Sequence, residues 1–305
     1  MSRMGMNVEI VEVGPRDGLQ NEARTLSVAA RLAFVRHLTA SGLKRIEVGA
    51  FVSPEWVPQM QGSRELIMAL YKARIPKGVR YSALVPNVRG MTDALLTPIP
   101  EIAVFGACSE SFSKRNINCS IAESLARFRD VIALAGKNKR KVRGYLSAAF
   151  GCPYEGQVSE AKVVNLVQAY LQLGIHEVSI GDTIGVASPK QVRSLLAKLK
   201  RRVPLKKIAL HFHDTRGTAL ANVLAGLDLG VRTFDSSFGG LGGCPYAKGA
   251  SGNLSTDDLL YMLHGMGFKT GVDLSKLLSF SAVIQKEVGH KLPSRTAEAG
   301  LPLLR

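Results

Sequence analysis

Eight short segments rich in β-branched residues alternate with longer segments in which apolar residues recur every three to four positions. This alternation constrains the fold most strongly, because it is typical of βα units, whose strands form a parallel sheet. Repetition without a long break favours a closed (β/α)8 TIM barrel, with an open doubly wound sheet as the alternative. The predicted strands are 8–13, 45–49, 80–84, 101–105, 142–148, 177–180, 207–211 and 233–236.

Amphipathic helical patterns fill the gaps between these strands. Segment 27–41 carries a single apolar stripe, and Ser188 followed by Pro189 is typical of a helix N-cap and first residue. We expect residues 1–270 to form the barrel domain. Residues 271–305 are expected to form a C-terminal extension of one or two helices and a tail packed on the barrel. The predicted helices of the barrel are 27–41, 121–135, 160–173, 189–199, 219–229 and 255–264.

The net charge of +16 attracts polyanions of several kinds. Much of it lies in 137–143 and 198–207, which are positioned like solvated connections between a helix and a strand. Aromatic residues make up only 6% of the chain and do not alternate with the basic ones, so we expect no nucleic-acid partner. A phosphate-bearing small molecule such as an acyl-CoA would be attracted by the same field.

Other composition features exclude further classes. No apolar run approaches the ~18 to 20 residues that span a bilayer, so we expect no membrane partner. The chain enters its first strand almost at once, which predicts a cytoplasmic protein without a targeting segment. We also expect a homodimer. The four cysteines lack zinc-site spacing and are too sparse for a disulfide framework, so we expect reduced thiols. They are Cys108, Cys119, Cys152 and Cys244.

Polar residues gather where several predicted strands end, which is the catalytic end of a barrel. The first strand is followed by Arg16, Asp17 and Gln20, and the second contains Glu47. The later ones are Asp182 and Thr183 after the sixth strand, His211, His213 and Asp214 at the seventh, and Cys244, Lys248 and Asn253 in the loop after the eighth.

The segment HFHDT is the sharpest of these signals. His211 and His213 are two apart on a strand and therefore share one face. A hydrogen-bonded pair of core histidines is the alternative, but Asp17 follows a strand that is close by in a barrel. Two imidazoles, one carboxylate and the amide oxygen of Asn253 would form a mixed nitrogen and oxygen site suited to Mg²⁺ or Mn²⁺.

The remaining polar residues leave alternatives open. Arg16 is either a structural ion-pair partner or a fixed cation aimed at a developing enolate. Glu47 and Asp182 are carboxylates within apolar strands and need partners, either as active-site groups or as support for them. Loop 239–253 contains six glycines and is either a tight turn or a lid, in which Cys244 is an inert thiol or a movable acid or base.

Several segments together resemble the 3-hydroxy-3-methylglutaryl-CoA lyases, members of a metal-dependent aldolase and Claisen-type TIM-barrel superfamily. The similarity runs from about Val8 to about Gly271 and retains the order of the motifs. These motifs are EVGPRDGLQNE, IEVGAFVSPEWVPQM, NINCSI, GCPYEG, GDTIGV, HFHDT and GGLGGCPYAKGASGNL.

The resemblance implies a retro-Claisen cleavage to acetyl-CoA and acetoacetate. It implies that Arg16 steadies the enolate and that Cys244 lies on a catalytic loop. Glu47, Asp182 and Gln20 would orient the substrate or shuttle protons, and His211 or Cys244 would protonate the enolate. The implied metal ligands are Asp17, His211, His213 and Asn253.

Two other functions compete with this one. A related lyase would act on a longer branched 3-hydroxy-3-acylglutaryl-CoA, for which the small Gly49 and Ala50 would leave room. The other is a non-catalytic basic binding protein on a barrel scaffold. The concentration of Arg16, Asp17 and the two histidines at strand ends argues against it.

Overall fold

A closed barrel of eight parallel strands forms the centre of the protein, in a computed structural model that describes residues 5–243 and 252–302. The strands pair in chain order, and β1 pairs with β8 to close the barrel. The closed (β/α)8 barrel is therefore confirmed, and so are all eight predicted strands. They are β1 (Glu9–Glu12), β2 (Arg45–Ala50), β3 (Arg80–Leu84), β4 (Glu101–Ala107), β5 (Lys141–Ser147), β6 (Glu177–Asp182), β7 (Ile208–Phe212) and β8 (Thr233–Ser236).

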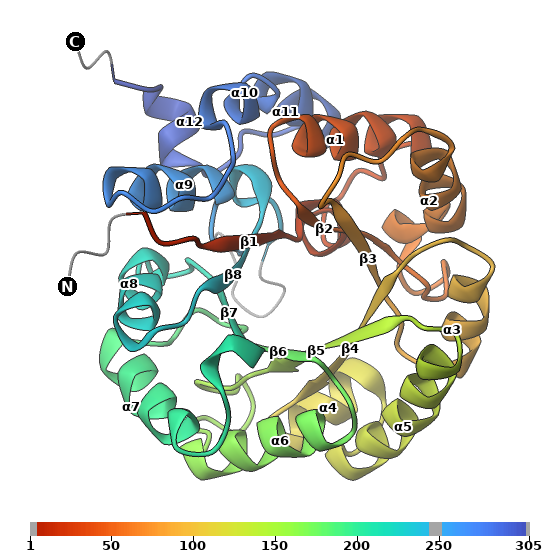
Figure 1. The fold of residues 1–305 in the computed structure, drawn as a ribbon, viewed down its shortest axis with the longest axis vertical. Helices are drawn as coiled ribbons and strands as arrows, with labels where there is room; N and C mark the ends of the chain where they lie inside the picture. The colour runs from red at the N-terminus through yellow and green to blue at the C-terminus, as the bar shows by residue number, and fades with distance from the viewer. Residues whose placement is uncertain (1–4, 244–251, 303–305) are drawn as a thin grey trace.

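Helices surround the strands on the outside (Figure 1). The six predicted helices are confirmed to within two residues at each end, whereas α2, α3 and α4 were not predicted. Ser188 caps α7 by accepting a hydrogen bond from the backbone N–H of Gln191, with Pro189 as the first helical residue. The helices are α1 (Val28–Ala40), α2 (Ser63–Lys72), α3 (Val88–Leu95), α4 (Glu110–Ile117), α5 (Ile121–Lys137), α6 (Glu160–Gln172), α7 (Pro189–Lys200), α8 (Ala219–Leu229) and α9 (Thr256–Gly265).

The C-terminal segment forms three short helices where one or two were expected, as far as the structure describes it. They are α10 (Leu274–Leu278), α11 (Ser281–Val288) and α12 (Arg295–Ala299). The pattern is divided because Gly289 ends α11 in a left-handed conformation and Ser294 caps a new helix. Phe280 stacks on His37 at a centroid distance of 4.5 Å, so the part of the segment around α10 and α11 packs beside α1, whereas α12 lies beside α9 (Figure 1).

Ion pairs cross the interior of the barrel. Arg45 on β2 contacts Glu177 on β6 at 2.8 Å, and Arg143 on β5 contacts Glu177 at 2.7 Å and Asp235 on β8 at 2.6 Å. These strands are not all neighbours, so the side chains meet inside the barrel. Barrel interiors are usually filled by branched apolar residues. Here buried, ion-paired side chains occupy part of that interior.

No helix among residues 5–243 and 252–302 is long and apolar enough to cross a membrane.

Gly144 on β5 provides a test of the packing between barrel and helices. An added Cβ would lie 2.7 Å from Cδ2 of Tyr170 and 3.1 Å from Cδ1 of Ile175. Overpacking of this kind typically costs about 1–3 kcal/mol, so Gly144→Ala should lower the free energy of unfolding in urea by that amount.

Gly136 on α5 is the matched control, because an added Cβ there meets nothing within 4 Å. Gly136→Ala should stabilise the protein by about 0.5–1 kcal/mol through helix propensity. Equal stability of the Gly144 variant and the unmodified protein would contradict the packing described here.

Candidate active site

A single π-helical turn after β1 positions the first two site residues. This turn, η1 (Gly14–Gly18), packs closely against Ser237: a Cβ added to Gly18 would lie only 2.7 Å from Oγ of Ser237. Glu12 holds this turn in place, because its Oε1 accepts hydrogen bonds from the N–H groups of Gly14 and Phe238, both at 2.8 Å. The turn therefore places Arg16 and Asp17 at the C-terminal end of the barrel.

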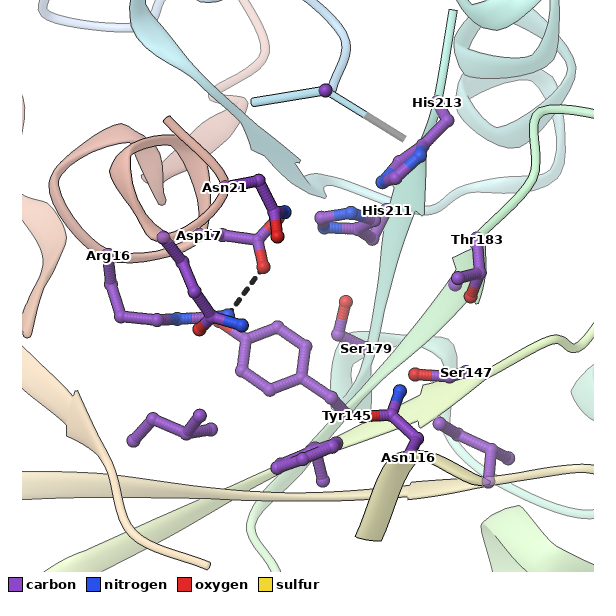
Figure 2. Close-up of a pocket in the computed structure, with 16 residues that line it drawn as sticks. Arg16, Asp17, Asn21, Asn116, Tyr145, Ser147, Ser179, Thr183, His211 and His213 are labelled. Atoms are coloured by element: carbon purple, nitrogen blue, oxygen red, sulfur yellow. Dashed lines mark hydrogen bonds and ion pairs between the residues drawn. The ribbon is translucent and has the colours of Figure 1, made fainter. Parts of the chain in front are cut away.

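Asp17 converges with the two histidines, as the sequence predicted. One potential ligand atom from each of Asp17, His211 and His213 lies within 4.8 Å of the others. Figure 2 shows the Asp17 carboxylate and the His211 ring pointing toward one another across the pocket. The three side chains form the only such group of His, Cys, Asp and Glu found in the part of the chain that the structure describes.

Asn253 completes this cluster from the other side. A β-bridge pairs its backbone with that of His213, and its side-chain nitrogen donates to Oδ2 of Asp17 at 2.9 Å. The Oδ1 atom of Asn253 and the Nδ1 atom of His213 are buried without a hydrogen-bond partner among residues 5–243 and 252–302. Buried polar atoms are normally paired. These atoms and the mixed donor set therefore fit a divalent cation.

At neutral pH, Asp17 and His213 are in the forms that bind cations, whereas, against the effect of burial, Asp235 raises the pKa of His211. Burial alone would raise the pKa of Asp17, but Arg16 and the two histidines lower it to about 2. Burial and the neighbouring His211 lower the pKa of His213 to about 3. Asp17 is thus a carboxylate and His213 a neutral imidazole, which are the protonation states that bind metals.

Arg16 is held by acceptors on two sides. Its guanidinium donates to Glu47 and to Asp17 and lies 5.3 Å from the centre of the Tyr145 ring. The Tyr145 hydroxyl donates to the other oxygen of Glu47 at 2.9 Å. Burial raises the pKa of Glu47 despite its cationic partner, and burial beside Glu47 raises that of Tyr145. Through its bond to the guanidinium, Glu47 holds Arg16 in position. Glu47 is not among the residues that line the adjoining pocket.

A pocket of about 190 Å³ lies over these residues (Figure 2). Sequence reasoning identified Gln20 and Thr183 among its lining residues but missed the contribution of β5. Arg143, Tyr145 and Ser147 alternate along that strand, which is the same period-two signal that identified the histidines. The other lining residues that were missed are Asn21, Leu84, Phe105, Asn116, Leu146, Ser179, Gly181 and Gly243.

Other predicted residues lie at the edge of the site or outside it. Both oxygens of Asp182 accept backbone N–H bonds, from Val186 at 2.9 Å and Ala187 at 3.0 Å, so Asp182 braces the loop after β6. Asp214 accepts from the N–H of Ala219 at the start of α8. Cys244 and Lys248 lie outside the described residues.

Gly49 does not face the pocket, which corrects the idea that it leaves room for a longer acyl chain. A Cβ at this position would point outward and meet Oγ of Ser63 at 2.6 Å and the buried Arg31 at 3.1 Å. The small residue is required by the packing of α1 and α2 on the barrel.

Comparison with known proteins identifies the relatives of this barrel. The sequence profile of the HMGL-like family matches residues 7–284. The chain belongs to the HMGL-like family. One member, the hydroxymethylglutaryl-CoA lyase of Pseudomonas mevalonii, is 50% identical over 96% of its own length and 97% of this chain. A Pseudomonas aeruginosa 3-hydroxy-3-isohexenylglutaryl-CoA/hydroxy-methylglutaryl-CoA lyase is 49% identical over 96% of both chains.

Solved structures of HMGL-like proteins share the whole fold. The HMG-CoA lyase of Bacillus subtilis superposes with a TM-score of 0.94 at 46% identity, covering 97% of this chain and 98% of its own. An Acinetobacter baumannii HMG-CoA lyase, solved with coenzyme A and 3-methylmalate, gives a TM-score of 0.92 at 36% identity, covering 98% and 97%.

His213→Ala tests the cation site of this HMGL-like protein directly. Loss of an imidazole should raise the Kd for Mn²⁺ at least about 10-fold, because losing even an outer-shell partner typically costs 10- to 100-fold. Isothermal titration calorimetry would measure it, with His264→Ala as control, since His264 lies on α9 and hydrogen-bonds Thr270. An unchanged Kd in the His213 variant would exclude this histidine as a ligand.

Glu12 predicts a pH dependence of stability. Burial raises its pKa from 4.5 to about 7, against the hydrogen bonds that favour its charged form. Because the folded state binds this proton more tightly than the unfolded state, the contribution of Glu12 to stability is lost as pH rises from about 4.5 to 7. Glu12→Gln keeps an acceptor for Gly14 and Phe238. Urea unfolding of this variant should therefore depend less on pH across that range than unfolding of the unmodified protein, and parallel profiles would contradict the raised pKa.

Proposed function

We propose that this protein cleaves 3-hydroxy-3-methylglutaryl-CoA to acetyl-CoA and acetoacetate with the help of a divalent metal ion. The observation that carries the proposal is the convergence of Asp17, His211 and His213 on one point beside the guanidinium of Arg16. Membership in a family whose similar relatives are named for this reaction supports the substrate. These relatives favour an enzyme over the non-catalytic binding protein.

The residues of the cation site fit Mg²⁺ or Mn²⁺, held by Asp17, His211, His213 and the amide oxygen of Asn253. A cation bound there would supply positive charge that favours loss of the proton from the 3-hydroxyl group of the substrate. The residues that would hold it come from η1 after β1, from the end of β7 and from the segment after β8, so only the closed barrel brings them together.

Arg16 supplies the second charge that the reaction needs. Carbon–carbon cleavage leaves the acetyl-CoA fragment with negative charge on its thioester oxygen. A guanidinium fixed by Glu47 and Asp17 and flanked by Tyr145 can stabilise that charge without reorganising. Cys244 would then donate the proton that converts the enolate to acetyl-CoA, because His211 is assigned to the cation.

The contacts of Glu47 and Asp182 support positioning roles within this scheme. Both oxygens of each carboxylate already accept hydrogen bonds, from Arg16 and Tyr145 in one case and from loop N–H groups in the other. Gln20 and Thr183 line the pocket and would contact the substrate. The cytoplasmic location and the homodimer stay predictions.

Formation of acetoacetate from 3-hydroxy-3-methylglutaryl-CoA tests the proposal. Activity should disappear with EDTA and return with Mg²⁺ or Mn²⁺. A folded, metal-loaded protein that forms no acetoacetate would overturn the assignment, and turnover of longer 3-acyl analogues in its place would establish the related lyase.

Arg16→Gln should lower kcat about 100-fold or more, because one preorganised contact to a developing oxyanion is typically worth about 3 kcal/mol. The Kd for Mn²⁺ should change little, since Arg16 is not a ligand. Arg193→Gln is the control, because Arg193 is half exposed and pairs with Asp228 on the outside of the barrel. Normal turnover in the Arg16 variant would rule out its assigned role.

A further inference from the structure

Asp235 lies beside His211, and the scheme proposed above gives this residue no role in the site. The register of β7 and β8 pairs the two residues directly, so their side chains point to the same face, into the barrel. The Nδ1 atom of His211 lies 3.4 Å from Oδ2 of Asp235. Asp235 is only 1% exposed and does not line the pocket, so it meets the site through His211 and Ser179.

The Asp235 carboxylate is held in one orientation. Arg143 donates to Oδ1 at 2.6 Å and to Oδ2 at 3.2 Å, and the hydroxyl of Ser179 donates to Oδ2 at 2.6 Å. The guanidinium of Arg143 donates to both carboxylate oxygens, and a fixed buried cation of this kind favours the charged form of Asp235. The group facing His211 is therefore an ionised carboxylate with no freedom to rotate.

We propose that Asp235 is a positioning residue that fixes the ring orientation and tautomer of His211 for metal binding. The contact is within ion-pair distance but lacks hydrogen-bond geometry, and Nδ1 of His211 has no hydrogen-bond partner among residues 5–243 and 252–302. Because an ionised carboxylate only accepts hydrogen bonds, we infer that Nδ1, the nitrogen that faces it, carries the hydrogen. The lone pair is then on Nε2, on the far side of the ring from Asp235, where a cation can bind it. Carboxylate, histidine and metal in this order recur in metal sites, where the carboxylate also makes the imidazole more basic. The inference rests on the proposed metal site.

A purely structural role for Asp235, as the counter-ion of Arg143, is the competing explanation. Glu177 provides the matched control, because it belongs to the same network without touching His211. It accepts from Nε of Arg143 at 2.7 Å and from Arg45 at 2.8 Å and is 6% exposed. Glu177→Gln and Asp235→Asn each remove one charge from the partners of Arg143, and only the second removes the acceptor beside His211.

Asp235→Asn should reverse the tautomer. The amide oxygen would keep the shorter bond from Arg143, at 2.6 Å. The amide nitrogen would then replace Oδ2, lose the bonds that Oδ2 accepts from Arg143 and Ser179, and donate to Nδ1 of His211. That places the hydrogen on Nε2 and blocks the lone pair that binds the cation. We expect the Kd for Mn²⁺, measured by calorimetry, to rise about 10- to 100-fold. In Glu177→Gln the Kd should stay within about threefold while the midpoint of urea unfolding falls.

A metal-free measurement tests the same point without a variant of Asp235. Long-range ¹H–¹⁵N spectra of the ¹⁵N-histidine-labelled protein at alkaline pH, assigned with His211→Gln, should show His211 as the Nδ1–H tautomer. An Nε2–H tautomer would overturn the inference. So would unchanged Mn²⁺ affinity in Asp235→Asn, or equal weakening in Glu177→Gln. If the unmodified protein bound no Mn²⁺, the metal site of the proposed function would fail together with the inference, whereas the first three results leave that site intact.

Discussion

The ion pairs of Arg143 inside the barrel are the constraint on which the rest of the structure depends. This guanidinium is 1% exposed and binds Glu177 on one side and Asp235 on the other. A buried charge without its partner typically costs 3–5 kcal/mol, so all three residues must be present and in register. The pairs set which strands face one another across the interior, because a register error on β5, β6 or β8 would separate the charges.

This network also supports both halves of the site from below. Arg143 lies 4.8 Å from the ring centre of Tyr145, whose hydroxyl holds Glu47 and through it Arg16. On the other side, Asp235 links the same guanidinium to His211, one of the proposed metal ligands. Arg16, which would stabilise negative charge, and the cation site are therefore both supported by the ion pairs of Arg143. Preorganisation of this kind is what electrostatic catalysis requires.

Much of the fold and site could be predicted from the chain, for local reasons. The strand–helix alternation predicts the barrel, and Ser188 with Pro189 predicts the start of α7. The cluster of Asp17 and the two histidines was predictable because the ends of all strands meet at one end of a barrel. Helices α2, α3 and α4 were missed because they are short, at eight to ten residues.

The sequence by itself determined the repeating βα units and the kinds of side chain that end each strand, because period and residue type are local properties. Only the tertiary structure decided which side chains meet inside the barrel. Arg45 and Glu177 are 132 residues apart and lie on strands that are not neighbours, so their contact depends on barrel closure and strand register. The outward direction of Gly49, toward Ser63, follows an irregularity in the pairing of β2 with β3. No local pattern encodes either, because both arise from how distant segments pack.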